Sequence, residues 1–234
     1  MACMVTAEVS VESRKVLKGA GLQLEEVNDI AAPRVSDVEA WNQSGYTKLN
    51  LWRLTHYSKI AYIDADCLVV QSMEDLFERD TDFAAAPDTF PPDRFNAGVL
   101  LLRPSLEVFE DMMLQIATTP SYDAGDTGFL NAYFPNWYTS GPEQRLPFGY
   151  NALRTMHWMT KKNPGYWQAV APIRCIHFCS FPKPWDKSPN GPLEQQWWVA
   201  FAKSQVMLAM KGCPGVTLKK PTPSEDDTPT QAPP

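Results

Sequence analysis

Two carboxylates separated by one small residue follow an apolar run in the first third of the chain: Asp64, Ala65 and Asp66 come directly after residues 60–63. Alternation along an extended segment places both aspartates on one side, about 6 to 7 Å apart. At an effective dielectric of about 20 the two carboxylates repel each other by roughly 2.5 kcal/mol. A divalent cation between them would attract both and so replace this repulsion with attraction. Oxygen ligands favour Mg²⁺ or Mn²⁺, and an added nitrogen ligand favours Mn²⁺. Taken alone, such a pair is more often a turn cap beside a solvated side chain.

A second segment with chemical potential lies near residue 180. His177 ends the strand-like run 173–178, and Lys183 stands between Pro182 and Pro184. Because proline restricts the backbone, this loop can hold one ammonium in place as a point charge for a phosphate. The competing interpretation is a hydrogen-bonded core histidine and a solvated lysine.

Two further segments combine small residues with polar ones. In residues 122–128, glycine and alanine allow a close approach of backbone to ligand, while Asp126 or Thr127 could equally cap the helix that follows. Asn96 stands at the lip of an apolar run that continues through Gly98, where a bulge or turn is the competing explanation.

The elements that must position these residues alternate between strand and helix patterns, which predicts an α/β fold. Because residues 60–63 are apolar on both faces, we expect a central strand covered by helices on both sides, with ligands at its carboxyl end. The expected strands are 2–6, 24–30, 59–66, 82–86, 98–102 and 173–178; the expected helices are 10–20, 47–57, a short one capped by Ser72 and Asp75, one that starts at Ser105 and carries Val108, Met112 and Ile116, one after Asp126, and 193–210.

Composition limits the class of protein. The chain has 234 residues, of which 44% are hydrophobic and 21% charged, and a formal net charge of −6. Without a basic run to neutralise phosphates, nucleic acid is not an expected partner. The apolar runs are far shorter than the roughly 20 residues of a membrane helix. We expect residues 1–212 to form the folded domain. Segment 213–234 is rich in proline and has few apolar residues, so we expect it to be a disordered tail.

The five cysteines are an odd number without a paired-loop spacing, which is typical of a reducing compartment, so we expect a cytoplasmic protein. Each cysteine is expected to be a small buried hydrophobic residue. Cys175, His177 and Cys179 alternate like zinc ligands, but the spacing of about 6.6 Å between residues i and i+2 of a strand is too long for one tetrahedral ion.

Together and in this order, these segments resemble the glycogenin-like branch of glycosyltransferase family 8. The matching text is YSKIAYIDADCLVV, FNAGVLLLRPS, YDAGDTGFLN, LPFGYN and HFCSFPKPW, followed by the pair at Trp197 and Trp198, and it covers roughly residues 44–200. The resemblance implies a GT-A fold, with a mixed central sheet flanked by helices. It also implies transfer of a sugar, with retention of configuration, from a nucleoside diphosphate donor with a divalent metal, usually Mn²⁺.

Carried over position by position, the resemblance assigns roles to residues of this chain. Asp64, Asp66 and His177 would be the metal ligands, and Lys183 would contact the diphosphate and help to neutralise its growing charge. Asp126 would act on the sugar, either as a nucleophile or by stabilising positive charge. The other residues expected around the UDP-sugar are Lys48, Ala65, Asn96, Ala97, Asp123, Thr127 and the backbone of Ser180.

The chain also departs from the pattern of that branch. The family normally begins with a nucleotide-binding strand and helix upstream of the residue that matches Met1, so the resemblance predicts an N-terminally truncated sheet and weaker donor binding. Thr127 stands where the branch has glutamine, and Ser180 where it has glycine. The branch glucosylates a tyrosine of its own after the KPW segment, whereas no tyrosine follows Tyr166 here. We therefore expect the acceptor to be another protein, a glycan or a small molecule.

Three hypotheses follow. The first is a metal-dependent retaining hexosyltransferase that uses UDP-glucose or a related UDP-sugar, with a homodimer as a further expectation. The second is a catalytically inactive relative that binds glycans or proteins. The third is a phosphatase of the haloacid dehalogenase type, because a strand ending in DxD is also that family's motif. It requires a later acidic pair, which the sequence offers only as Asp226 and Asp227.

Overall fold

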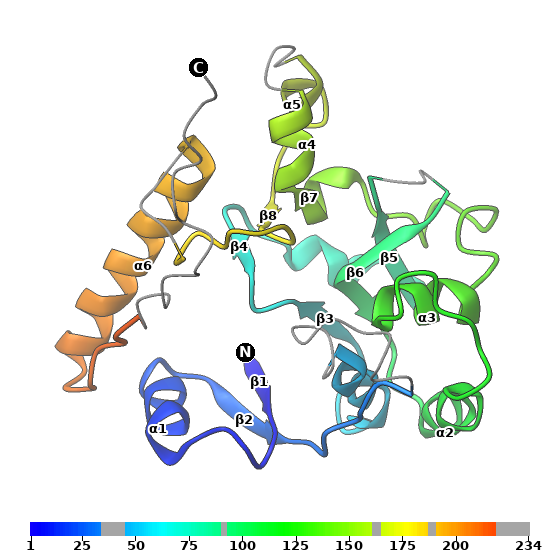
Figure 1. Ribbon diagram of the computed structural model, residues 1–234, viewed down its shortest axis with the longest axis horizontal. Helices are drawn as coiled ribbons and strands as arrows, with labels where there is room; N and C mark the ends of the chain where they lie inside the picture. The colour runs from blue at the N-terminus through cyan, green and yellow to red at the C-terminus, as the bar shows by residue number, and fades with distance from the viewer. Residues whose placement is uncertain (34–44, 90–92, 161–164, 187–190, 219–234) are drawn as a thin grey trace, which may run out of the picture.

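The computed structural model describes residues 1–33, 45–89, 93–160, 165–186 and 191–218 (Figure 1). Within these residues the strands form three small sheets. β1 (Ala2–Val5) runs parallel to β2 (Gln23–Glu26); β3 (Ile60–Ile63), β6 (Phe95–Leu102) and β5 (Phe83–Pro87) form the second sheet in that order; β4 (Cys67–Val69), β8 (Cys175–His177) and β7 (Ala152–Leu153) form the third. Parallel and antiparallel pairs both occur, so the prediction of a mixed α/β architecture is confirmed.

The N-terminal unit follows local sequence signals closely. Helix α1 (Val11–Gly19) begins after Ser10, whose hydroxyl accepts a hydrogen bond from the Ser13 N–H at 3.1 Å. An N-cap of this kind satisfies one of the free N–H groups of the first turn. Strand β2 ends at Glu26, four residues earlier than the predicted segment 24–30.

The buried centre of the fold is β6 rather than β3. Leu100 and Leu102 of β6 pack on one face, against η3 (Gly45–Arg53), α2 (Leu106–Gln115) and α3 (Asp126–Tyr133), while Val99 and Leu101 pack on the other. In the described residues β3 pairs with β6 alone, and its four residues are half-buried. The prediction of a central, fully covered strand at 60–63 was therefore wrong, because β6 occupies that position.

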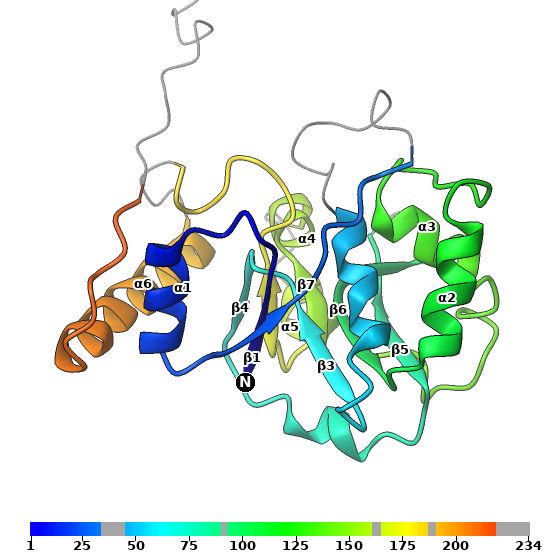
Figure 2. The same ribbon diagram turned by 90° about the horizontal axis from the view of Figure 1, so that it is seen from below.

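Helices cover one side of this sheet. Figures 1 and 2 both place α2 and α3 on the same side of the molecule, far from α6 (Pro192–Met210). Ser105 caps α2 by accepting from the Val108 N–H at 3.2 Å, and Met112 is fully buried, as the helical pattern predicts. The helix expected over 47–57 is the 3₁₀ helix η3, which ends at Arg53.

A register shift between β5 and β6 shapes the edge of the site. Ala85 pairs with Leu100, whereas the next residue, Ala86, pairs with Asn96, so residues 97–99 have no partner in β5. The Gly98 carbonyl instead accepts from the Asp64 N–H at 2.8 Å. The shift therefore ties the Asn96–Gly98 segment to the end of β3.

The third sheet brings distant segments beside β3. Residues 64–66 connect β3 directly to β4, which pairs antiparallel with β8 so that Cys67 lies opposite His177. The remaining elements around it are η4 (Glu74–Glu78), η5 (Phe148–Asn151), α4 (Arg154–Met159) and α5 (Gly165–Ala169).

The described residues after α6 form a short segment without regular structure. Residues 213–218 form neither helix nor strand, and residues 219–234, with Asp226 and Asp227, lie outside the described residues. Among the described helices none is long and apolar enough to cross a membrane.

Candidate active site

A cavity of about 790 Å³ gathers most of the residues singled out from the sequence. Its size is typical of small-molecule sites. The predicted residues that line it are Lys48, Asp64, Ala65, Asp66, Asn96, Asp123, Asp126, Thr127, His177 and Lys183. Ala97 and Ser180 are not in its wall: Ala97 is fully buried and offers its carbonyl to Lys48, and Ser180 contacts Arg154.

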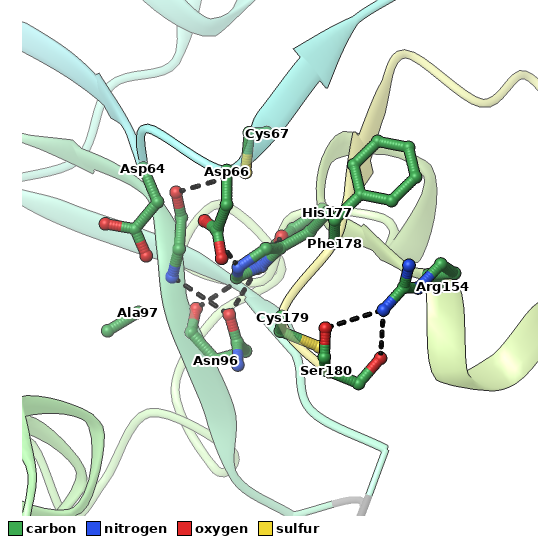
Figure 3. A network of polar contacts seen from close by, with 12 residues as sticks. Asp64, Asp66, Cys67, Asn96, Ala97, Arg154, His177, Phe178, Cys179 and Ser180 are labelled. Atoms are coloured by element: carbon green, nitrogen blue, oxygen red, sulfur yellow. Dashed lines mark hydrogen bonds and ion pairs between the residues drawn. The ribbon is translucent and has the colours of Figure 1, made fainter. Parts of the chain in front are cut away.

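The first cluster of charges in the cavity surrounds Asp66. Its Oδ1 lies 3.2 Å from the His177 Nε2, and its Oδ2 accepts from the Lys183 Nζ at 2.6 Å (Figure 3 shows Asp66 and His177). Although burial opposes ionisation, the hydrogen bonds and charges of His177 and Lys183 hold the pKa of Asp66 well below its usual value. The structure thus brings Asp66, His177 and Lys183 together in one cluster.

His177 is oriented by a chain of amides that starts at the backbone. The Gly98 N–H donates to the Asn96 Oδ1 at 2.9 Å, and the same oxygen accepts from the Asn151 Nδ2 at 2.8 Å. The Asn151 Oδ1 therefore faces the His177 Nδ1, 2.9 Å away. Because an amide oxygen only accepts, Nδ1 carries a hydrogen, so Nε2 is the nitrogen that donates to Asp66 when the ring is charged and that can bind an ion when the ring is neutral.

Gly98 leaves room for this histidine. A Cβ atom at Gly98 would lie 2.3 Å from the His177 Cε1 and 2.9 Å from the Asn96 Oδ1. No side chain fits at such distances, so a close approach between β6 and the imidazole ring requires glycine at this position.

The second cluster of charges is the buried pair of Lys48 and Asp126. The Lys48 Nζ donates to the Asp126 Oδ2 at 2.6 Å and also lies 3.2 Å from the Asp64 Oδ1. Burial raises the pKa of Asp126, and the Lys48 ammonium opposes that shift. Although burial alone would lower it, Asp126 and Asp64 hold the pKa of Lys48 well above its usual value.

Asp64 is held apart from the first cluster. Its Oδ1 accepts from the Tyr62 hydroxyl at 2.6 Å and its Oδ2 from Lys48 at 3.3 Å. Among the described residues, the group of donor atoms close enough for one ion contains Asp66 and His177 but not Asp64. The structure therefore brings together two of the three predicted metal ligands, with Asp64 turned toward Lys48.

Asp123, rather than Asp126 or Thr127, supplies the hydrogen bonds at the start of α3. Its Oδ1 accepts from the backbone N–H groups of Gly125 and Gly128, both at 2.9 Å, and from the Ser121 hydroxyl at 2.7 Å. The interpretation of Asp126 or Thr127 as the helix cap was wrong: Gly125 is the N-cap residue and no side chain caps from that position. Asp126 is thereby left to face Lys48.

Asp88 is a cavity residue that the sequence reasoning missed. It follows β5 directly, lines the cavity, and its Oδ2 accepts from the Asn96 Nδ2 at 3.3 Å. Burial raises the pKa of Asp88, against the hydrogen bonds from the Thr89 N–H and Asn96. The available signal was a carboxylate directly after an apolar strand, the same signal that identified Asp64.

Arg154 holds the turn that carries Ser180. It is 1% exposed, and its Nη2 donates to the Ser180 carbonyl at 2.6 Å (Figure 3) and to the Pro182 carbonyl at 2.8 Å. Its Nη1 pairs with Glu194 at 3.2 Å. Because Lys183 comes next in the chain, Arg154 fixes the backbone from which that ammonium reaches Asp66.

These donor groups fit a hard or borderline divalent cation. Carboxylate oxygens from Asp66 and, after rotation, Asp64 would join the free Nε2 of His177, a mixed oxygen and nitrogen set suited to Mn²⁺. The tautomer fixed by Asn151 is the one that such coordination needs.

Comparison with known proteins places this geometry in a family. The family model described as glycosyl transferase family 8 matches residues 1–188. The chain belongs to glycosyl transferase family 8. This confirms the resemblance seen in the ordered motifs.

Among the curated family 8 relatives, glycogenin-1 of Caenorhabditis elegans is 36% identical over 213 residues, which are 83% of this chain and 46% of that protein. Glycogenin-2 of Homo sapiens is 39% identical over 144 residues, 62% of this chain and 28% of that protein. Inositol phosphorylceramide glucuronosyltransferase 1 of Arabidopsis thaliana is 33% identical over 221 residues, 86% of this chain and 38% of that protein. The chain thus spans less than half the length of these relatives.

Two solved structures share the fold of this family 8 chain. The galactosyltransferase LgtC, in complex with donor and acceptor sugar analogues, has a TM-score of 0.61 at 17% identity and covers 89% of this chain and 84% of its own. The glycosyltransferase GlyE of Streptococcus pneumoniae TIGR4 has a TM-score of 0.60 at 19% identity, with 90% and 63% covered. The predicted GT-A fold is confirmed.

Proposed function

We propose that this chain is a metal-dependent hexosyltransferase that moves a sugar, with retention of configuration, from a UDP-sugar to a glycan, protein or small-molecule acceptor. One observation carries the proposal: a single cavity holds the Asp66, His177 and Lys183 cluster beside the buried pair of Lys48 and Asp126. The first cluster would bind the charged diphosphate of the donor, and the region around Lys48 and Asp126 would bind its neutral sugar. UDP-glucose is the first donor to test, because two of the compared relatives are named glycogenins.

The diphosphate end of the donor would be bound by the first cluster. Asp64, Asp66 and His177 would hold Mn²⁺, which as a Lewis acid neutralises charge on the phosphates when it is bound. The Lys183 ammonium donates to the Asp66 Oδ2 at 2.6 Å and to the Phe178 carbonyl at 2.8 Å. Its third hydrogen is available to a phosphate oxygen. This ammonium would stabilise the charge that grows as the sugar–phosphate bond breaks.

The sugar end of the donor would lie against the carboxylates and amides of Asp88, Asn96, Asp123 and Asp126. Asp126 is the carboxylate whose charge is already balanced, by Lys48 at 2.6 Å. It would act either as the nucleophile or by stabilising positive charge on the sugar. In the second case the acceptor hydroxyl attacks the anomeric carbon from the face that UDP leaves, and the departing phosphate takes its proton.

The direct test is release of UDP from UDP-glucose and UDP-galactose, with and without Mn²⁺. Asp66→Asn and Lys183→Met should each lower the Mn²⁺-dependent rate by roughly 100-fold or more. Asp82→Asn, at a side chain that is 87% exposed, is the matched control and should keep the wild-type rate. Unchanged turnover in Asp66→Asn would refute the proposal.

The alternative of an inactive binding protein makes a different prediction for the same samples. Calorimetry that shows Mn²⁺-dependent binding of UDP without any turnover of UDP-sugars favours it. The phosphatase hypothesis has no support in the family to which the chain belongs.

A further inference from the structure

The thiol of Cys67 lies beside two of the proposed metal ligands and has no role in the proposed sugar transfer. It directly follows Asp66 and opens β4, where its Cα is paired with that of His177 in the antiparallel ladder. Residues directly opposite each other in such a pair send their side chains to the same face. The sulfur of Cys67 is therefore placed on the His177 side of the sheet by the backbone pairing itself.

The side chains confirm this placement. Asp66, Cys67 and His177 (Figure 3) each offer one possible metal-binding atom, and these three atoms lie within 4.8 Å of one another. Among the described residues, these three form the group of side chains that could hold a metal ion. Bonds of roughly 2.0 to 2.3 Å from a tetrahedral ion to its oxygen, nitrogen and sulfur ligands place those ligands about 3.6 Å apart. The widest separation in the group therefore needs to shorten by no more than about 1 Å.

The chemistry of this set differs from that of a Mn²⁺ site. A thiolate is a soft ligand and selects Zn²⁺ or Cd²⁺ over Mg²⁺ and Mn²⁺. An imidazole nitrogen and a carboxylate oxygen complete three ligands that Zn²⁺ commonly takes, with water as the fourth. Asn151 holds the His177 Nδ1, so the Nε2 is the ring nitrogen available to the ion.

We propose that Asp66, Cys67 and His177 form a site for a thiophilic divalent cation, Zn²⁺ or Cd²⁺. On binding, a sulfur–metal bond forms and the thiol proton passes to the solvent. The ion would displace the Lys183 ammonium, which lies 2.6 Å from Asp66, and would take two ligands from the Mn²⁺ site. Thiophilic ions are therefore inhibitors of this protein. The binding part of the inference stands alone, whereas the inhibition rests on the proposed function.

The binding part is tested by titrating the purified, fully reduced full-length protein with Cd²⁺ alone and recording the ultraviolet charge-transfer band of the cadmium–thiolate bond. We expect a saturable band at one equivalent in the wild type and its loss in Cys67→Ser. His177→Gln should weaken Cd²⁺ binding by roughly 10- to 100-fold. Cys3→Ser and Cys213→Ser, at cysteines in other parts of the fold, are the matched controls and should keep the band.

An unchanged band in Cys67→Ser would overturn the proposal. Thermal unfolding and circular dichroism of Cys67→Ser establish that the variant is folded, and the His177→Gln titration provides a second, independent test of the same site. If His177→Gln binds Cd²⁺ as tightly as the wild type, the proposed ligand set is also wrong.

The inhibition is tested by adding Zn²⁺ to the Mn²⁺-supported release of UDP. Half-inhibition should require at least about 10-fold more Zn²⁺ in Cys67→Ser than in the wild type, each measured against its own uninhibited rate. Equal sensitivity of the two proteins would contradict the inhibition. A protein without any turnover would contradict the proposed function, while the optical titration would still decide the metal site.

Discussion

The His177 Nδ1 lies 2.9 Å from the Asn151 Oδ1, and the amide of Asn151 is itself oriented by Asn96, whose oxygen is anchored on the Gly98 N–H. Three residues from two separate segments thereby fix which nitrogen of the His177 imidazole carries hydrogen. Asn151, Asn96 and Gly98 orient His177 so that its Nε2 can bind a ligand, and they do not need to contact that ligand themselves.

Removing the amide of Asn151 should therefore weaken metal binding without removing a ligand. We expect Asn151→Ala to lower Mn²⁺ affinity and Mn²⁺-dependent activity by roughly 10- to 100-fold, because the ring loses its tautomer and its orientation. Calorimetric titration with Mn²⁺ and UDP measures the effect directly. Asn136→Ala, at an exposed asparagine, is the control; equal Mn²⁺ affinity in the two variants would show that Asn151 has no orienting role.

Lys48 should be essential for folding as well as for the site. Lys48→Met leaves the buried Asp126 carboxylate without its cation, and we expect a loss of about 3 to 5 kcal/mol in the free energy of unfolding. Because burial already raises the pKa of Asp126, losing Lys48 raises it further, so the deficit should shrink as the pH falls and the carboxyl becomes neutral. Urea unfolding at neutral and mildly acidic pH measures both effects.

The double variant Lys48→Met/Asp126→Asn is the internal control for that experiment. It removes both charges of the pair, and it should recover most of the stability lost in Lys48→Met. A double variant as unstable as the single one would mean that Lys48 acts through packing and not through its charge.

Asp66→Asn should show the opposite dependence on pH. The folded-state pKa of Asp66 is depressed, so its stabilising contribution is present above the unfolded pKa of about 3.9 and is lost progressively as the pH falls below that value. In the presence of a chelator, we expect Asp66→Asn to be less stable than wild type by about 1 to 3 kcal/mol near neutral pH, and the difference to narrow at about pH 3. A deficit that stays constant with pH would contradict the ion pairing with His177 and Lys183.

Arg154→Lys should slow transfer even though its side chain does not line the cavity. A lysine ammonium cannot reproduce the planar fork that reaches Ser180, Pro182 and Glu194, so the backbone before Lys183 loses its anchor. We expect kcat for UDP release to fall by roughly 10- to 100-fold. The KM for the UDP-sugar should change less, since Lys183 acts most strongly on the charge of the breaking bond.

The control for Arg154 is Arg103→Lys, at a side chain that is 43% exposed and forms ion pairs with the exposed Asp80 and Asp82. A thermal unfolding midpoint measured on both variants separates loss of folded protein from loss of rate. Wild-type kcat in a folded Arg154→Lys protein would show that the turn needs no anchor.

Local signals in the sequence predicted much of the fold. Ser10 and Ser105 both cap the helices that follow them, and the helix expected over 193–210 is α6 within one residue. Of the two residues predicted to cap η4, only one forms a hydrogen bond at the start of that helix. Ser72 does accept from the Glu74 N–H at 3.3 Å, but Asp75 is engaged by Tyr150 and Arg174 instead. Short-range hydrogen bonds follow from spacing, whereas tertiary partners compete for a carboxylate that a local pattern assigns to a helix.

Ten of the residues predicted from the ordered motifs line the cavity, but the sequence did not show how the charges there are paired. The position of β6 between β3 and β5, with its register shift, depends on which strands meet, and nothing in the run 60–63 reveals that it has one strand partner in the described part of the chain. The same limitation hid Cys67. Spacing within one strand argued against Cys175, His177 and Cys179 as ligands, while the sulfur that lies within 4.8 Å of donor atoms of Asp66 and His177 comes from the strand paired with β8.

The absence of a side chain at Gly98 means that a single substitution, Gly98→Ala, can displace His177. A single added methyl group there would meet the imidazole of His177, yet it would leave the net charge of −6 and every titratable group unaltered. We expect such a variant to be a better reference for studies in cells than any aspartate replacement, because electrostatic attraction to partners stays the same while the imidazole of His177 is pushed out of place.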